Sequence, residues 1–267
     1  MSWRIGSVRY LNARPLIYGI ENRVTLCEPA RLADLLHEGR LDVGLVPIAE
    51  VLRHDQYDVV DGIAIAARGA VQSVYLAHRE PVEKLRRVAV DPASRTSAWL
   101  VRVILRYGYH VTPEFYPGTE GMTLQDHEAM MLIGDQAIRH LARHDGLPVL
   151  DLGTAWMNLT NLPFVFAGWA VRHRTGSPEA GDPADGSAAA VAELARLLRD
   201  AKADGLGHLE EIVQAATEAP ADFLRAYYTR HVWYDLGEAE KRGIRRFQQY
   251  LKEMGLVKAT HEIRYVR

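Results

Sequence analysis

The chain has 267 residues, 48% of them hydrophobic, so it is long enough to bury a core as one large domain or two smaller ones without disulfides or a structural metal. Its 32 basic and 34 acidic residues give a formal net charge of -2, which removes any electrostatic reason to expect nucleic acid or an anionic membrane as a partner. The single cysteine, Cys27, excludes an intramolecular disulfide. No run approaches the ~20 apolar residues that span a bilayer, and the N-terminus has no apolar leader, so we expect a cytoplasmic protein.

Short apolar or alternating runs take turns with runs of helical period along most of the chain. This order predicts an α/β fold with mostly parallel sheets and covering helices. The expected strands are 3–8, 24–28, 43–46, 59–66, 71–78, 87–90, 110–116, 129–133 and 149–152. The expected helices among them are 15–20, 29–37, 48–53, 94–107 and 135–144. After a loop at 175–187 that is rich in Gly and Pro, helices are expected at 188–203, 207–217, 220–232 and 238–254.

The first candidate binding segment follows the expected strand 3–8. Pro15 suits the first turn of a helix and disfavours a helical conformation at the preceding residue, Arg14. Asn12 therefore lies in a loop at the carboxyl end of a strand, and Arg9 belongs to the same loop. In open α/β sheets, ligands bind at this end of the strands.

The second candidate segment begins the expected helix 94–107, where Ser94, Thr96 and Ser97 crowd the N-terminus. Free backbone N–H groups, the positive end of the helix dipole, these hydroxyls and Arg95 together suit a carboxylate. N-capping by Ser94 is the simpler interpretation, but it accounts for only one of the three hydroxyls.

Two further positions complete the candidate site. Gly134 follows the buried strand 129–133 and would let a ligand approach the backbone, while Asp135 either caps the next helix, lines a cleft, or does both. Ser73 places a hydroxyl within the apolar strand 71–78.

Motifs for other chemistries are missing from the sequence. It contains no G-x-S-x-G, Walker A or G-x-G-x-x-G motif. His140 and His144 are four residues apart, but no glutamate lies beside His140, so we interpret both as surface residues. We therefore expect no metal, no cofactor and no covalent serine chemistry.

Taken together, the motifs resemble those of the chorismate dehydratases, enzymes of the futalosine route to menaquinone. The likeness covers nearly the whole chain, and the motifs that carry it occur in the family's order: VRYLNARPL at 8–16, LVP at 45–47, VQS at 71–73, SRTS at 94–97, LIGD at 132–135, DLGTAW at 151–156 and LPFVFAGW at 162–169.

The resemblance implies a two-lobed fold of the type II periplasmic-binding-protein class, with a ligand cleft between the lobes. Lobe one is expected to comprise residues 1–78 and 170–267, and lobe two residues 79–169. The chain would cross between them near 77–83 and 166–172.

It also implies a cofactor-independent hydro-lyase that converts chorismate, a small-molecule substrate, to 3-[(1-carboxyvinyl)oxy]benzoate. Asn12 and Ser73 are expected to be catalytic, around the reacting C3 and C4 positions. The expected substrate-binding residues are Arg9, Ser94, Arg95, Thr96, Ser97, Gly134 and Asp135. Two proton acceptors stay open, namely the enolpyruvyl carboxylate of the substrate and Asp135.

Three other functions compete with this interpretation. A 1,4-dihydroxy-6-naphthoate synthase of the same pathway would share the fold, but the loop of Tyr10, Leu11 and Asn12 argues against it. A solute-binding protein would need export, for which the N-terminus shows no signal. A ligand-sensing domain usually accompanies a DNA-binding segment, and no basic segment is present.

Overall fold

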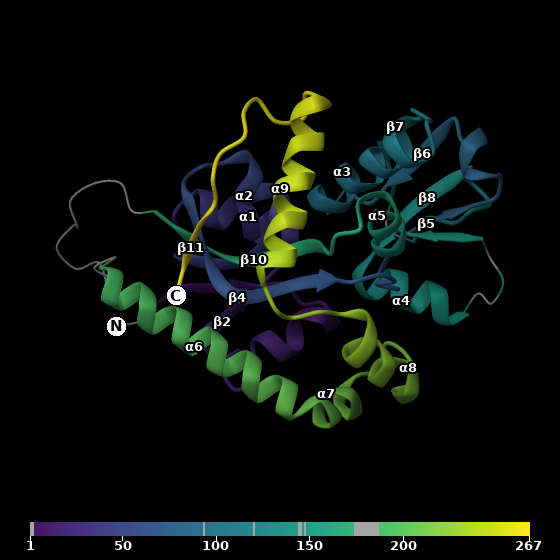
Figure 1. Cartoon of the computed structure of the whole chain (residues 1–267). Coiled ribbons are helices and arrows are strands. Elements are labelled where there is room, and N and C mark those ends of the chain that lie inside the picture. Colours follow the sequence, from purple (N-terminus) through teal and green to yellow (C-terminus); the bar gives the residue numbers. More distant parts are fainter. Residues whose placement is uncertain (1–2, 93, 120, 144–145, 147, 174–186) are drawn as a thin grey trace.

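The computed structural model describes residues 3–92, 94–119, 121–143, 146, 148–173 and 187–267. Two β-sheets lie side by side, each covered by helices, and the helices α6 (Ala188–Gly207) and α7 (Leu209–Ala215) run along one edge of the molecule (Figure 1). The expected loop at 175–187 falls outside the described residues except for its last position, and His144 falls outside them too.

Lobe one is built on a six-stranded sheet with the order β11-β4-β10-β3-β1-β2. Its strands are β1 (Ile5–Ser7), β2 (Val24–Leu26), β3 (Val43–Pro47), β4 (Tyr57–Ala67), β10 (Phe164–Arg172) and β11 (Arg264–Val266). Lobe two is built on a five-stranded sheet with the order β7-β6-β8-β5-β9. Its strands are β5 (Val74–His78), β6 (Arg87–Val90), β7 (Glu114–Pro117), β8 (Ala129–Ile133) and β9 (Val149–Asp151).

Both sheets are mixed rather than mostly parallel. Of the nine strand pairings among the described residues, five are parallel and four are antiparallel. All four antiparallel pairings involve β5 or β10. The chain enters a new lobe at each of these two strands, and each strand is antiparallel to both of its neighbours.

The crossings between lobes lie earlier in the chain than the sequence indicated. The strand β5 was expected in lobe one, yet it pairs with β8 and β9 inside the sheet of lobe two. The first crossing is therefore the segment 68–73, not 77–83. The second crossing falls between β9 and β10, because the whole of β10 belongs to the sheet of lobe one and 166–172 is not a hinge.

The α-helices follow the expected ranges closely, apart from one that the sequence did not indicate, α5. They are α1 (Pro29–His37), α2 (Ile48–Arg53), α3 (Arg95–Val103), α4 (Gly134–Arg143), α5 (Leu152–Thr160), α6, α7, α8 (Ala221–Ala226) and α9 (Glu238–Glu253). Two of them continue as π-helices, α3 into η4 (Ile104–Gly108) and α8 into η5 (Tyr227–His231). The described residues also form three short 3-10 helices, namely η1 (Leu11–Leu16), η2 (Glu21–Arg23) and η3 (Val82–Lys84). None of the described helices is both long enough and apolar enough to cross a membrane.

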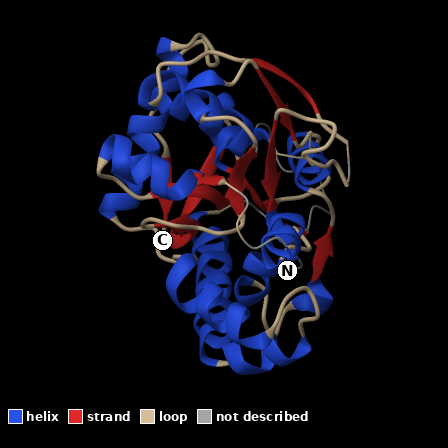
Figure 2. Ribbon diagram, turned by 90° about the vertical axis from the view of Figure 1, so that its right-hand side faces the viewer, coloured by secondary structure: helices blue, strands red, loops and turns tan. Residues whose placement is uncertain are grey.

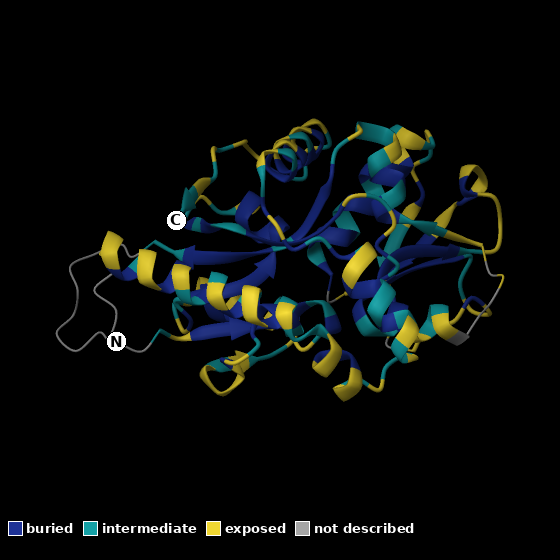
Figure 3. Cartoon of the chain, turned by 60° about the horizontal axis from the view of Figure 1, so that its bottom comes forward, coloured by how far each residue is buried: buried dark blue, intermediate teal, exposed yellow. Residues whose placement is uncertain are grey.

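Helices cover the strands from outside, as a second view shows (Figure 2), and buried residues follow the strands of both lobes (Figure 3). Aromatic side chains hold the second crossing in place. Trp156 of α5 packs edge-on against Phe164 of β10 and Phe247 of α9, with ring centroids 5.1 and 5.8 Å apart, and its indole N–H donates to the carbonyl of Pro163 at 3.2 Å. This cluster fixes α5 against lobe one.

The polar segment after β1 forms η1 rather than a loop followed by a helix at 15–20. Pro15 lies inside this 3-10 helix instead of starting a longer one. The helix α6 packs closely on η1, since a Cβ at Gly205 would lie 2.1 Å from the carbonyl oxygen of Pro15. The lack of a side chain at Gly205 thus lets α6 support the turn that carries Asn12.

Candidate active site

A cleft opens where the edges of the two lobes face each other. Its lining combines apolar side chains with a few hydroxyls and one amide. The lining residues are Val8, Tyr10, Asn12, Pro29, Leu45, Pro47, Ile65, Val71, Ser73, Val74, Ser94, Thr96, Ser97, Ile133, Gly134, Phe166 and Ala167. Six of the nine residues that the sequence singled out are therefore brought together, namely Asn12, Ser73, Ser94, Thr96, Ser97 and Gly134.

Asn12 enters the cleft from η1, whose start is held from two sides. The backbone N–H of Leu11 donates to Asp135 Oδ1 at 2.9 Å, and the carbonyl of Leu11 accepts the Tyr228 hydroxyl at 3.0 Å. The side-chain oxygen of Asn12 is buried and finds no donor among the residues that the structure describes. A buried acceptor without a donor costs free energy, so this oxygen is placed to receive a hydrogen bond from a ligand.

Ser73 ends the first crossing and is fully buried. The two residues before it donate their backbone N–H groups to Asp151, Val71 at 3.0 Å and Gln72 at 2.8 Å. Gln72 lies in the left-handed region with φ of 60°, a conformation that a non-glycine residue rarely adopts. Asp151 therefore holds the turn that brings the Ser73 hydroxyl to the cleft.

The three hydroxyls at the start of α3 belong to buried residues, and those of Ser94 and Thr96 accept hydrogen bonds. Ser94 caps the helix by accepting the Ser97 N–H at 3.2 Å, as the simpler interpretation required. The Thr96 hydroxyl accepts the Ala49 N–H at 3.1 Å, a contact with lobe one. All three still line the cleft, so the helix N-terminus faces the space where a ligand would lie.

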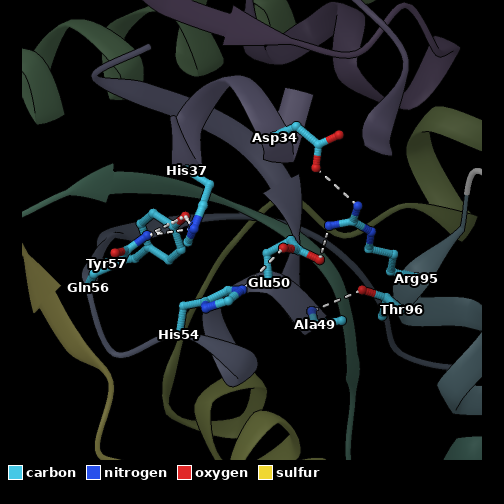
Figure 4. Close-up of polar contacts among 9 residues, drawn as sticks. All are labelled: Asp34, His37, Ala49, Glu50, His54, Gln56, Tyr57, Arg95 and Thr96. Carbon is cyan, nitrogen blue, oxygen red and sulfur yellow. Dashed lines mark hydrogen bonds and ion pairs between the residues drawn. The ribbon is translucent and has the colours of Figure 1, made fainter. Parts of the chain in front are cut away.

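Arg95 does not line the cleft, contrary to the sequence-based expectation. Its guanidinium lies between two carboxylates of lobe one, 2.8 Å from Glu50 and 3.2 Å from Asp34 (Figure 4). Glu50 is 3% exposed, and its other neighbour is His54 at 3.9 Å. Burial lowers the pKa of His54, so that ring stays neutral and Arg95 is the cation that balances Glu50. The ion pair joins α2 to α3 across the lobes.

We expect Glu50→Gln to lower the free energy of unfolding by about 2 kcal/mol and to raise KM several-fold, because Arg95 would lose its buried partner while Asp34 stays. Chemical denaturation and steady-state kinetics measure both effects. Glu114→Gln is the matched control, since the Arg87–Glu114 pair has exposures of 57% and 66% and should contribute little. Equal behaviour of the two variants would contradict a role for Glu50 in holding the lobes together.

Gly134 has φ of 57°, and a Cβ there would lie 3.1 Å from the Tyr10 ring. Arg9 and Asp135, in contrast, line an adjoining groove that shares Tyr10 with the cleft. Arg9 is exposed and donates to the Leu26 carbonyl at 3.1 Å. Neither reaches the cleft lining, because Arg9 turns toward lobe one and Asp135 is bonded to the backbone of η1.

Two substitutions of Asp135 distinguish a role as proton acceptor from a structural role. Asp135→Asn keeps an oxygen for the Leu11 N–H and should retain most activity, whereas Asp135→Ala should lose about 1 kcal/mol of stability and several-fold in kcat/KM. A loss of about 100-fold or more in the Asn variant, measured as kcat, would instead identify Asp135 as the base.

The Asp135→Asn variant also tests how the stability of the protein depends on pH. Burial raises the pKa of Asp135, although the Leu11 N–H bond lowers it in part. A raised pKa in the folded state stabilises the protein below the ordinary aspartate pKa of about 4, and this contribution is lost as pH rises through the folded-state pKa. Relative to wild type, Asp135→Asn should therefore gain stability as pH rises toward neutrality, which thermal unfolding across pH would detect.

The cleft itself is poor in charge. The described residues that line it include no carboxylate, imidazole, ammonium or guanidinium group, and its one phenol is Tyr10. Burial chiefly raises the pKa of Tyr10, so this phenol stays protonated. An anionic ligand would be held by hydroxyls, the Asn12 amide and the positive end of α3.

The sequence did not single out several residues that position this site. Asp151 and Tyr228 bind backbone groups next to Ser73 and Asn12. Glu50 holds the guanidinium of Arg95. The sequence contains one signal, for Glu50: this residue interrupts the apolar run 48–52 of a short expected helix, and a carboxylate buried there requires a partner.

Comparisons with known proteins show the family to which the sequence belongs. The sequence model of a family described as "Menaquinone biosynthesis" matches residues 3–253. A chorismate dehydratase of Thermus thermophilus is 30% identical over 269 aligned positions, which cover 92% of this chain and 94% of the relative.

Solved structures show the same fold at lower identity. Protein AF1704 of Archaeoglobus fulgidus superimposes with a TM-score of 0.65 at 14% identity, covering 96% of this chain and 98% of its own. The periplasmic aliphatic sulphonate binding protein SsuA of Escherichia coli superimposes with a TM-score of 0.55 at 17% identity, covering 98% and 90%. The expected α/β fold of the periplasmic-binding-protein class is confirmed. With the family model covering nearly the whole sequence, the chain belongs to the menaquinone biosynthesis family.

Proposed function

We propose that this chain is a hydro-lyase that dehydrates chorismate to 3-[(1-carboxyvinyl)oxy]benzoate. The observation that carries the proposal is the buried side-chain oxygen of Asn12, which lacks a donor, beside the Ser73 hydroxyl in an otherwise apolar cleft. The relative from Thermus thermophilus bears the name of this activity.

The reaction removes a proton from C3 and hydroxide from C4. The electron pair of the C3–H bond forms the C3–C4 double bond of the aromatic ring as the C4–O bond breaks, and the departing hydroxide and the proton together make water. No atom outside the substrate gains or loses electrons, so the step needs no redox partner. This balance supports the proposal that the enzyme works without a cofactor, and aromatisation supplies the driving force.

The proposed roles follow from the cleft. The N-terminus of α3, with Ser94, Thr96 and Ser97, binds one substrate carboxylate. Asn12 and Ser73 hydrogen-bond around C3 and C4, where they orient the leaving hydroxyl and stabilise the charge that develops on it. Arg9 and Arg95 are not proposed to bind the substrate, because neither side chain lines the cleft.

The enolpyruvyl carboxylate of the substrate is the proposed proton acceptor. No described residue that lines the cleft offers a carboxylate or imidazole for this task, and Asp135 is bonded to the backbone of η1. The enolpyruvyl group is attached at C3, so its carboxylate can reach the C3 proton within the same molecule.

The cytoplasmic location expected from the sequence stays a prediction.

The test is to incubate purified protein, treated with a metal chelator and dialysed, with chorismate and to separate the products by chromatography. We expect the carboxyvinyloxy-benzoate to form in proportion to the enzyme concentration. Chorismate that stays intact while it binds would instead support a solute-binding protein, the function that SsuA carries on the same fold.

A further inference from the structure

Two consecutive tyrosines of η5 reach the two catalytic segments from behind the cleft. The Tyr227 hydroxyl donates to Ser73 Oγ at 2.9 Å, and the Tyr228 hydroxyl donates to the Leu11 carbonyl, next to Asn12, at 3.0 Å. Their exposures are 0% and 2%. Both side chains are therefore part of the core, and their hydroxyls are directed at the segments that carry Ser73 and Asn12.

The backbone at this point is unusual. The helix α8 widens into a π-helix at Tyr227, where the Val232 N–H bonds to the Tyr227 carbonyl at 3.1 Å. Single π turns are rare and often occur at functional sites, because the added residue redirects side chains at a cost in regular hydrogen bonding. Here the widened turn begins at the two tyrosines that support the cleft.

The contact with Tyr227 determines how Ser73 can bond. A serine hydroxyl has one donor hydrogen and two acceptor lone pairs. The phenol is the stronger acid of the two and donates, so one lone pair of Ser73 is occupied while its own hydrogen is free to bond elsewhere. Since Ser73 lines the cleft and no described residue accepts that hydrogen, the remaining direction is toward a ligand.

We propose that Tyr227 is a positioning residue for the dehydration, which directs the Ser73 hydroxyl hydrogen at the leaving C4 oxygen of the substrate. This inference rests on the proposed function. Tyr227 does not touch the substrate and transfers no proton; burial raises its pKa, which keeps the phenol protonated as a donor. The hydrogen bond from Ser73 stabilises the oxygen as the C4–O bond breaks, and hydroxide leaves with the electron pair of that bond.

The experiment compares the single variants Tyr227→Phe and Ser73→Ala and the double variant in chorismate turnover. Tyr227→Phe should lower kcat about 10-fold with KM changed less than about 2-fold, because one orienting hydrogen bond is lost and ground-state contacts stay. Ser73→Ala should lower kcat about 100-fold. In the double variant, the loss of kcat should be smaller than the product of the two single losses, because Tyr227 acts on the leaving oxygen through Ser73, although its phenol also hydrogen-bonds the Asn12 side chain.

Tyr234→Phe is the matched control, because Tyr234 is also a buried tyrosine of the C-terminal segment but its hydroxyl has no partner among the described residues. Its kcat should stay within about 2-fold of wild type. Thermal unfolding of each variant shows whether it is folded. Should Tyr227→Phe fail to fold, 3-fluorotyrosine at position 227 keeps the hydroxyl and makes it a stronger donor, and kcat should be retained.

Equal kcat in Tyr227→Phe and Tyr234→Phe, multiplied losses in the double variant, or a loss of kcat with 3-fluorotyrosine at position 227 would overturn the inference and leave the proposed function standing. A wild-type protein that does not turn over chorismate would overturn the proposed function itself, and this inference with it. The two failures are thus distinguished by the wild-type measurement.

Discussion

Asn12→Asp is expected to lower kcat/KM for chorismate by at least about 100-fold, although the two side chains have nearly the same shape. The Asn12 oxygen is buried, and no charged group among the described lining residues can balance a new carboxylate. The substrate brings two carboxylates of its own, so the variant would add a like charge beside them and would remove the amide donor. Steady-state kinetics with chorismate measures the loss.

Asn161→Asp is the control for this exchange. Asn161 is exposed at the end of α5, so the same chemical change there should leave kcat/KM within about 2-fold of wild type. An Asn12→Asp variant that turned over chorismate at the wild-type rate would show that the amide has no part in the reaction.

Asp151→Ala is expected to lower the free energy of unfolding by about 3 kcal/mol and to remove most activity. One carboxylate accepts backbone N–H groups of Val71 and Gln72 at the first crossing and of Thr154 at 2.9 Å at the start of the second. Without it, three backbone donors lose their partner and the left-handed Gln72 loses its restraint. Since Ser73 is the next residue, its hydroxyl would shift away from the cleft.

Urea denaturation together with chorismate kinetics tests this prediction. Asp126→Ala serves as control, because Asp126 is exposed and accepts one hydrogen bond from Thr123 Oγ1 at 3.1 Å. The control should change stability by about 0.5 kcal/mol or less. Similar stability of the Asp151 and Asp126 variants would mean that the carboxylate of Asp151 does not hold the crossings together.

Local patterns predicted the regular elements well. The helix α1 has the bounds that Pro29 at its first turn and the amphipathic repeat indicated, and β8 has those of its apolar run. Hydroxyls at the start of α3, the glycine after β8 and Asn12 all line the cleft as expected, because each follows a strand end that faces the other lobe.

Features that depend on contacts between residues far apart in the sequence could not be predicted from local patterns. An apolar run such as β5 has the same pattern in either sheet, so the first crossing was placed too late. The direction of Arg95 is set by the buried Glu50, on a helix of the other lobe. Tyr227 and Tyr228 reach the cleft from the C-terminal part of the chain, and nothing in their local sequence indicates their partners.

The most direct test of the central claim, that the substrate supplies its own base in this cleft, is to measure turnover of a chorismate analogue whose enolpyruvyl carboxylate is a methyl ester. If the substrate supplies its own base, the ester should bind, as calorimetry would show, but react at least about 100-fold more slowly than chorismate. Turnover of the bound ester at a rate close to that of chorismate would contradict the claim and would place the proton acceptor on the protein.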